Sequence, residues 1–121
     1  MPERAASHIF HVTFARDWRD AQAAGEYRIS TRDSRFEDVG FIHAGFADQY
    51  VRVGSRIFAD AIEPLVVLVI DSERVGVPVQ VEDLHAEGEA FPHIYGPLPL
   101  IAVVEVLPAR IIDGALVVDG A

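Results

Sequence analysis

The pattern of apolar positions in the first quarter of the chain changes from a period of two to a helical spacing. Residues 8–14 (HIFHVTF) alternate between two faces, which predicts a strand with His11 on its more polar face. From residue 15 onward the apolar positions recur at helical intervals, which predicts a short helix that ends at Gly25. The chain therefore begins with a strand that leads into a helix.

A polar stretch separates this unit from a second strand and helix. Residues 26–39 are rich in arginine and poor in apolar side chains, so we expect a short extended piece followed by an exposed, substrate-facing flap. Residues 41–45 (FIHAG) predict a brief strand, and a helix covering residues 49–61 is expected to begin near Asp48. His43 then lies close to the junction of this strand and helix.

The second half of the chain is dominated by strand patterns. Residues 65–70 (LVVLVI) form a continuous apolar run, which predicts a central strand buried on both faces. Alternation over residues 75–84 predicts another strand, and further strand-like runs at residues 101–107 and 111–118 are split by Pro108 and Gly114. The helices thus come early and the strands late.

This order of elements predicts an α+β fold. Few β-α-β units of full length are present, so we expect a mostly antiparallel, split β core rather than a doubly wound parallel sheet. The expectation is six to eight short strands and two helices in the N-terminal half. The 121 residues form a single domain, with its core within residues 8–118.

Composition excludes several classes of chemistry. The chain has no cysteine, which removes disulfides, thiolate nucleophiles and cysteine-based metal sites. It also has no lysine, and its net charge of −9 disfavours binding to nucleic acid. No signal sequence or membrane-spanning apolar run is present, so a cytoplasmic protein without a membrane partner is expected.

The most unusual segment is FPHIYGPL at residues 91–98. Pro92 and Pro97 bracket His93 and Tyr95, which predicts a stiff loop rather than a regular strand and holds both side chains accessible for ligand binding. The alternative is that these side chains only satisfy neighbouring backbone groups.

Two further histidines are candidates for a pocket. His11 lies on the first strand and His43 precedes the small residues Ala44 and Gly45, which would let a ligand approach the backbone closely. A structural role for His11 and a tight turn at His43 are the alternatives. The histidines lack the spacing of a metal motif, so no metal site is predicted.

Charged residues supply weaker candidates. Arg28 and Arg32 lie in the polar stretch and could bind a phosphate or carboxylate, although a solvated loop explains them as well. Glu87 and Glu89 could serve as an acid and base pair, but their segment looks exposed, and we do not assign them to the site.

The order of the motifs resembles the bacterial domain-of-unknown-function family 952. The matching segments are IFHVTF, Trp18 with Ala21, Gly25 and Tyr27, GFIHAGF, LVVLVID and FPHIYGPL. The resemblance covers residues 8–118. The chain departs from the family's usual GFIHCS pattern at Ala44 and Gly45, so a thiol and a hydroxyl at these positions are not essential here.

A more distant resemblance is to the ADP-ribosyltransferase superfamily, including the tRNA 2′-phosphotransferases, through IFHVT and FIHAG. It implies a split antiparallel core and a pocket for NAD or ADP-ribose. In that arrangement His11 would bind the nucleotide, His43 would line the nicotinamide side, and Glu105 would orient a ribose hydroxyl.

Three interpretations of function remain open at this point. The first is a transferase-like enzyme that uses NAD or a related nucleotide. The second is a non-catalytic module that binds a small molecule or nucleotide through the same residues. The third is a structural or interaction domain in which the histidines only satisfy backbone groups.

Overall fold

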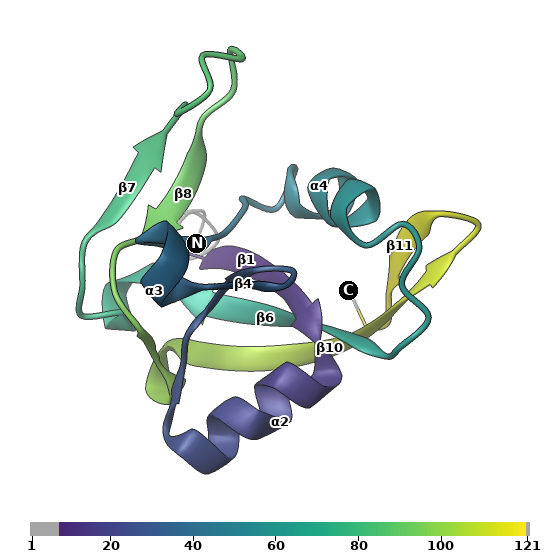
Figure 1. Ribbon diagram of the computed structural model, residues 1–121, viewed down its shortest axis with the longest axis horizontal. Coiled ribbons are helices and arrows are strands. Elements are labelled where there is room, and N and C mark those ends of the chain that lie inside the picture. Colours follow the sequence, from purple (N-terminus) through teal and green to yellow (C-terminus); the bar gives the residue numbers. More distant parts are fainter. Residues whose placement is uncertain (1–7, 121) are drawn as a thin grey trace.

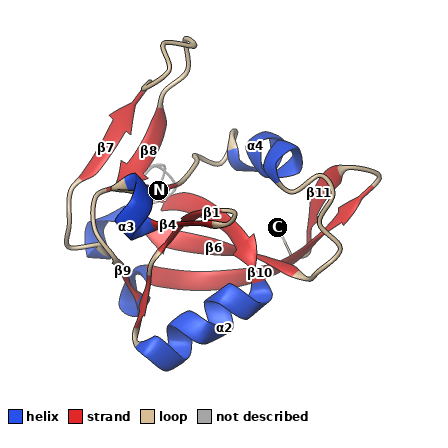
Figure 2. Ribbon diagram, in the orientation of Figure 1, coloured by secondary structure: helices blue, strands red, loops and turns tan. Residues whose placement is uncertain are grey.

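The computed structural model describes residues 8–120 and has an α+β fold, as predicted (Figures 1 and 2). The described residues form eleven strands in four antiparallel sheets, together with three α-helices. The strands are β1 (His8–Phe14), β2 (Glu26–Tyr27), β3 (Ile29–Thr31), β4 (Ser34–Arg35), β5 (Ile42–His43), β6 (Leu65–Asp71), β7 (Val79–Glu82), β8 (Phe91–Ile94), β9 (Leu98–Pro99), β10 (Val103–Ile112) and β11 (Ala115–Val118). The helices are α2 (Ala15–Ala24), α3 (Phe36–Val39) and α4 (Tyr50–Ile57), with 3₁₀ turns η1 (Ser72–Arg74) and η2 (Leu100–Ala102).

The central sheet has the strand order β1-β6-β10-β11, with β6 as an inner strand. β6 pairs with β1 over the whole of its length and with β10 on its other side. The predicted central strand at residues 65–70 is therefore confirmed. Its uninterrupted apolar sequence is explained by packing on both faces of the sheet, since alternate side chains of a strand point to opposite faces.

Each face of the central sheet is covered by one long helix. Leu68 and Ile70 of β6 pack on the side that also holds Ala21 of α2. Val67 and Val69 pack on the opposite side with residues of α4 and its following turn. Figure 1 shows α2 on one side of this sheet and α4 on the other.

A second sheet, β5-β8-β7, extends away from the central one as an arm (Figure 2). The β5 strand pairs with β8 so that His43 lies opposite His93. The arm is joined to the edge of the central sheet by an isolated bridge, in which Phe10 and Gly45 exchange two backbone hydrogen bonds of 2.8 Å.

The prediction of a stiff loop at residues 91–98 is wrong for its first half. Phe91–Ile94 is β8, the middle strand of the arm sheet. The carbonyl of Pro92 accepts a hydrogen bond from the Ala44 amide at 3.1 Å, so the Pro92 nitrogen also faces the β5 side, beyond the last residue of β5. The missing N–H therefore interrupts no bond to β7.

The predicted break at Pro108 is also wrong, because β10 runs through it. The Pro108 carbonyl accepts a hydrogen bond from the Asp119 amide at 2.8 Å, so its nitrogen faces the β11 side. The last pair between β10 and β11 is Ala109 with Val118, and Pro108 lies just past it. No hydrogen bond to β6 is lost at this proline.

Three other expectations need correction. Residues 26–39 begin with the expected extended piece, as β2 and β3, but the rest forms β4 and the unpredicted helix α3 rather than an irregular loop. The helix expected at residues 49–61 is shorter, and Gln49 rather than Asp48 is its N-cap residue. The number of strands exceeds the expected six to eight because four of them are only two residues long. Within residues 8–120, no helix is long and apolar enough to cross a membrane.

Burial in the central sheet predicts that the same isoleucine-to-alanine substitution has very different effects on the free energy of unfolding at two positions. Ile70 on β6 is fully buried, whereas Ile62 is 98% exposed. Replacement Ile70→Ala should lower the free energy of unfolding by about 2–5 kcal/mol through lost burial and a residual cavity. Replacement Ile62→Ala should change it by less than about 0.5 kcal/mol. Urea unfolding followed by circular dichroism measures both, and equal effects would contradict the described core.

Candidate functional site

A cleft lies between the arm and α4. The cleft consists of two adjoining hollows, with cavity volumes of about 50 and 230 Å³. The two hollows share five of their lining residues, which are His43, Ala44, Val53, Ile57 and Phe91. The hollows therefore adjoin each other, and His43 is one of the residues that border both.

The smaller hollow is mainly apolar. Phe10 and Val12 of β1 line it, together with Tyr50 of α4 and Phe58. The rings of Phe10 and Tyr50 are stacked with centroids 4.6 Å apart. These residues provide a surface suited to a flat, uncharged part of a ligand.

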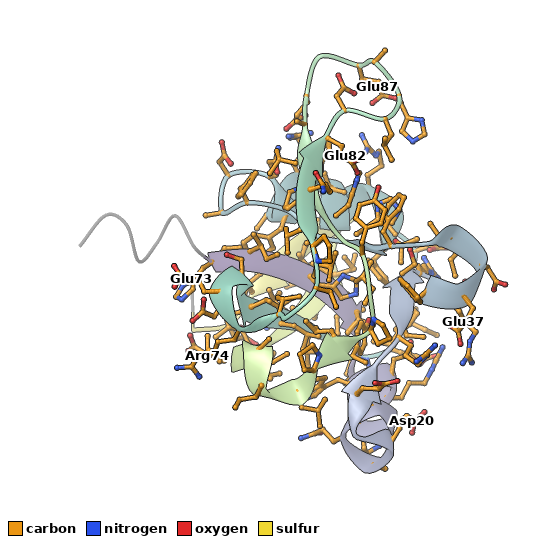
Figure 3. All side chains as sticks on the ribbon, turned by 90° about the vertical axis from the view of Figure 1, so that its left-hand side faces the viewer. Asp20, Glu37, Glu73, Arg74, Glu82 and Glu87 are labelled. Atoms are coloured by element: carbon orange, nitrogen blue, oxygen red, sulfur yellow. The ribbon has the colours of Figure 1, made fainter. Side chains whose placement is uncertain are left out.

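The larger hollow is bordered by the arm and carries mostly negative charge. Glu82, Asp83, Glu87 and Glu89 line it, with Arg56 as the single arginine among its lining residues. Figure 3 shows Glu82 on the arm, with Glu87 farther out near its tip. Neutral or cationic groups are favoured over free phosphates in such a field.

Glu89 connects the two walls of the cleft. Its carboxylate accepts hydrogen bonds from the Gln49 amide at 3.1 Å and from the Arg52 guanidinium at 2.5 Å. The Gln49 amide also donates to the Ala90 carbonyl at 2.9 Å. The start of α4 is thus attached to the base of the arm loop.

His43 is the central polar group of the cleft. Burial, followed by the positive charge that His93 and His85 can carry, lowers its pKa to about 4. Its ring lies edge-on to that of His93, with centroids 5.3 Å apart. His43 is therefore neutral at neutral pH and offers one donor and one acceptor nitrogen.

His11 borders the smaller hollow, and its buried ring holds His43 in place. Its Nδ1 is 2.5 Å from the His43 carbonyl oxygen, and its Nε2 is 2.7 Å from the Tyr27 hydroxyl. A carbonyl can only accept, so Nδ1 carries the proton and Tyr27 donates to Nε2. Burial lowers the pKa of His11 to about 4 and raises that of Tyr27, so both groups are neutral.

The predicted polar face of β1 is in fact its buried face. His11 and Thr13 are 3% and 2% exposed, and Ile9 lies beside them in the core. The pattern of residue types was misleading because this polar face packs against α2 and Tyr27 rather than against solvent. With both ring nitrogens bonded, His11 acts on the cleft through the backbone of His43.

His93 and Tyr95 converge on a carboxylate that the sequence analysis did not single out. The Nδ1 atom of His93 is 2.8 Å from Glu82 Oε1, and the Tyr95 hydroxyl donates to the same oxygen at 2.6 Å. These two hydrogen bonds lower the pKa of Glu82, and the bond from Tyr95 has the larger effect. Contrary to the expectation of an accessible loop histidine, His93 is only 4% exposed.

Aromatic packing fixes the orientation of His93. The Phe41 ring stacks on it with centroids 4.2 Å apart and an angle of 27° between the planes. Phe41 also contacts the rings of His43 and Tyr95. The alternation over residues 75–84 puts Glu82 on a polar face, but nothing in the sequence shows that the pairing of β7 with β8 brings it to His93.

The remaining candidates lie away from the histidines. Arg28 forms ion pairs with Glu26 at 2.5 Å and Glu37 at 3.3 Å. Arg32 donates to the Ile57 carbonyl and to Asp60. Neither arginine is among the residues that line the cleft.

Glu105 is exposed on β10, opposite Val69 of β6, and does not line the cleft. Within the described part of the chain, no three histidine or acidic side chains are arranged to hold a metal ion. The structure therefore brings together His11, His43, His93 and Tyr95, and separates them from Glu105.

Comparison with known proteins identifies the family. Residues 12–106 match the family described as "protein of unknown function (DUF952)". The chain belongs to the DUF952 family. Among curated proteins, none matches it.

Solved structures with the same fold come from protein CC0527 of Caulobacter crescentus. The DUF952 chain is 25% identical to its crystal structure, with a TM-score of 0.78 and coverage of 91% of this chain and 93% of that one. The solution NMR structure is 28% identical, with a TM-score of 0.67 and coverage of 90% of each chain. These matches include no ADP-ribosyltransferase, so that resemblance depends on the two short motifs.

In this DUF952 chain, Gly45 has a packing role. A Cβ atom at this position would lie 3.3 Å from backbone atoms of Tyr50, which is a tight contact. The glycine therefore lets the start of α4 approach the bridge between Phe10 and Gly45 closely.

The buried, neutral state of His11 predicts a pH-dependent stability. Its folded pKa lies below its ordinary value of 6.5, so the unfolded chain binds more protons, and stability is lost as the pH falls from about 6.5 toward 4. Between pH 7.5 and pH 5 this histidine should account for a loss of about 2 kcal/mol. Urea unfolding at both pH values should show a smaller loss for His11→Gln than for the wild type. The matched variant His8→Gln should lose as much stability as the wild type between pH 7.5 and pH 5. Equal losses of unfolding free energy in all three proteins would contradict the role assigned to His11.

The hydroxyl of Tyr27 predicts a second stability effect. Replacement Tyr27→Phe removes the donor to His11 Nε2 and leaves a buried acceptor unpaired, which should cost about 1–3 kcal/mol. Tyr50→Phe is the control, since no hydrogen bond of its hydroxyl is observed within residues 8–120, and it should cost less than about 0.5 kcal/mol. Thermal unfolding of both variants compares them, and a neutral Tyr27→Phe would exclude the proposed hydrogen bond.

Proposed function

We propose that the DUF952 chain binds a small molecule in the cleft between the arm and α4. The observation that carries this proposal is the pair of adjoining hollows, of which the mainly apolar one borders His43 and the acidic one borders both His43 and His93. A mainly apolar pocket with a few fixed polar groups is the usual form of a small-molecule site. A purely structural role for the histidines gives no reason for His43 to border both hollows.

The charges around the cleft restrict the ligand. Four carboxylates and one arginine line the larger hollow, so the favoured ligand presents a neutral or cationic group there. The stacked rings of Phe10 and Tyr50 provide an apolar wall for a flat ring. A ligand whose flat ring carries no negative charge fits these two surfaces.

NAD is the specific ligand that we propose to test first, in a transferase-like enzyme. Its nicotinamide ring is flat and positively charged, which suits the acidic hollow, whereas its negatively charged pyrophosphate has to lie outside that hollow. The motifs around His11 and His43 resemble those of ADP-ribosyltransferases. His43 would contact the ring, and His11 would position His43 through its carbonyl. Glu105 has no part in this proposal because it lies outside the cleft.

A thermal-shift titration tests the proposal. NAD at about 100 times its Kd should stabilise the wild-type protein by about 2.7 kcal/mol. ADP-ribose, which lacks the cationic ring, should stabilise it less. The shift should be lost in His43→Ala and kept in His8→Ala, a matched histidine variant on β1 outside the cleft.

The outcomes separate the alternatives. Release of nicotinamide on incubation with NAD would identify an enzyme, whereas binding without release would identify a non-catalytic module. Absence of a shift with NAD, ADP-ribose and simple nucleotides would reject the nucleotide proposal. An equal shift in wild type and His43→Ala would place the ligand elsewhere.

A further inference from the structure

The cleft contains one imidazole nitrogen that is held in place but has no protein partner. His93 is bonded through Nδ1 to Glu82, and within residues 8–120 no partner is observed for its Nε2. No buried side-chain nitrogen or oxygen in that range lacks a partner, so Nε2 must keep some contact with solvent. Since His93 is only 4% exposed and lines the larger hollow, that contact is with the cleft.

The proton on His93 is also determined by its surroundings. Glu82 Oε1 already receives the proton of the Tyr95 hydroxyl, and a carboxylate can only accept from the imidazole. Nδ1 of a neutral His93 therefore carries the ring proton, and Nε2 presents a lone pair. The stacked Phe41 ring keeps that lone pair in one direction.

We propose that His93 is the proton acceptor of the cleft and acts on a hydroxyl group of the bound molecule. In this step the O–H bond of the ligand breaks, its electron pair stays on oxygen, and the proton forms a bond with Nε2. The positive charge that develops on the ring is balanced by the Glu82 carboxylate, which Tyr95 holds in position. Glu82 and Tyr95 are positioning residues, and the ligand class is a hydroxyl-bearing small molecule with a flat ring.

This inference rests on the proposed ligand site, but its test does not require a ligand. Diethyl pyrocarbonate is a small electrophile that reacts with unprotonated imidazole nitrogens, and mass spectrometry of peptides shows which histidine is modified. In the folded wild-type chain His93 should be modified through Nε2. His11 should be protected because both of its nitrogens are bonded and its side chain is buried.

Two variants test whether Glu82 orients His93 as a base or whether the His93 ring is only accessible to the reagent. Glu82→Gln should slow modification of His93 by about tenfold, by analogy with metal-bound histidines, whose activity falls by about 10–100-fold when the partner that orients the ring is lost. Glu73→Gln, an exposed glutamate on η1 far from the cleft lining, should leave the rate unchanged. Absence of modification at His93, or an equal rate in Glu82→Gln and wild type, would overturn the proposal.

A spectroscopic measurement keeps the proposal testable if Glu82→Gln does not fold. Long-range ¹H–¹⁵N spectra of the wild-type histidine rings should show the proton of neutral His93 on Nδ1, and a proton on Nε2 would refute the assignment. Repeating the modification with NAD present separates the two proposals. Modification of His93 that NAD does not slow would leave the proton acceptor in place and reject NAD as the occupant of the cleft.

Discussion

The imidazole of His11 connects three segments that the backbone ladders join only weakly. It stands on β1, accepts from Tyr27 at the end of β2 and donates to the carbonyl of His43 at the end of β5. The bridge between Phe10 and Gly45 also links β1 to the arm sheet, and Ile9 shares a buried cluster with Ile42 and Ile94 of the arm. Because an unpaired buried imidazole is costly, these bonds favour the one arrangement in which all three segments meet.

The two histidines facing each other across β5 and β8 have different roles as a result of their backbone positions. His43 is held through its carbonyl, which leaves its ring available in the cleft, whereas His93 is held through its ring by Glu82. Neither arrangement needs a metal ion or a positive charge. The cleft thus gains fixed hydrogen-bonding groups in an acidic protein while keeping an apolar wall beneath α4.

The periodicity of apolar residues predicted the long elements, and it was most reliable where a strand has the same surroundings on both faces. The run at residues 65–70 identified the inner strand β6 because burial on both faces requires an unbroken apolar sequence. Pro92 and Pro108 were misinterpreted because the effect of a proline in a strand depends on which neighbour its nitrogen faces. Glu82 was missed because its bond to His93 depends on the pairing of β7 with β8, which no local pattern encodes.

The tip of the arm, residues 83–90, is a place where proteins of this fold can differ in length and sequence. Residues 83–90 belong to neither hydrophobic cluster, yet several of them border the cleft. Insertions or deletions there would change the size and charge of the opening without repacking the interior, since loop tips tolerate such changes. Proteins built on this scaffold can therefore acquire new ligand preferences through the length of one hairpin while the histidine framework behind it stays intact.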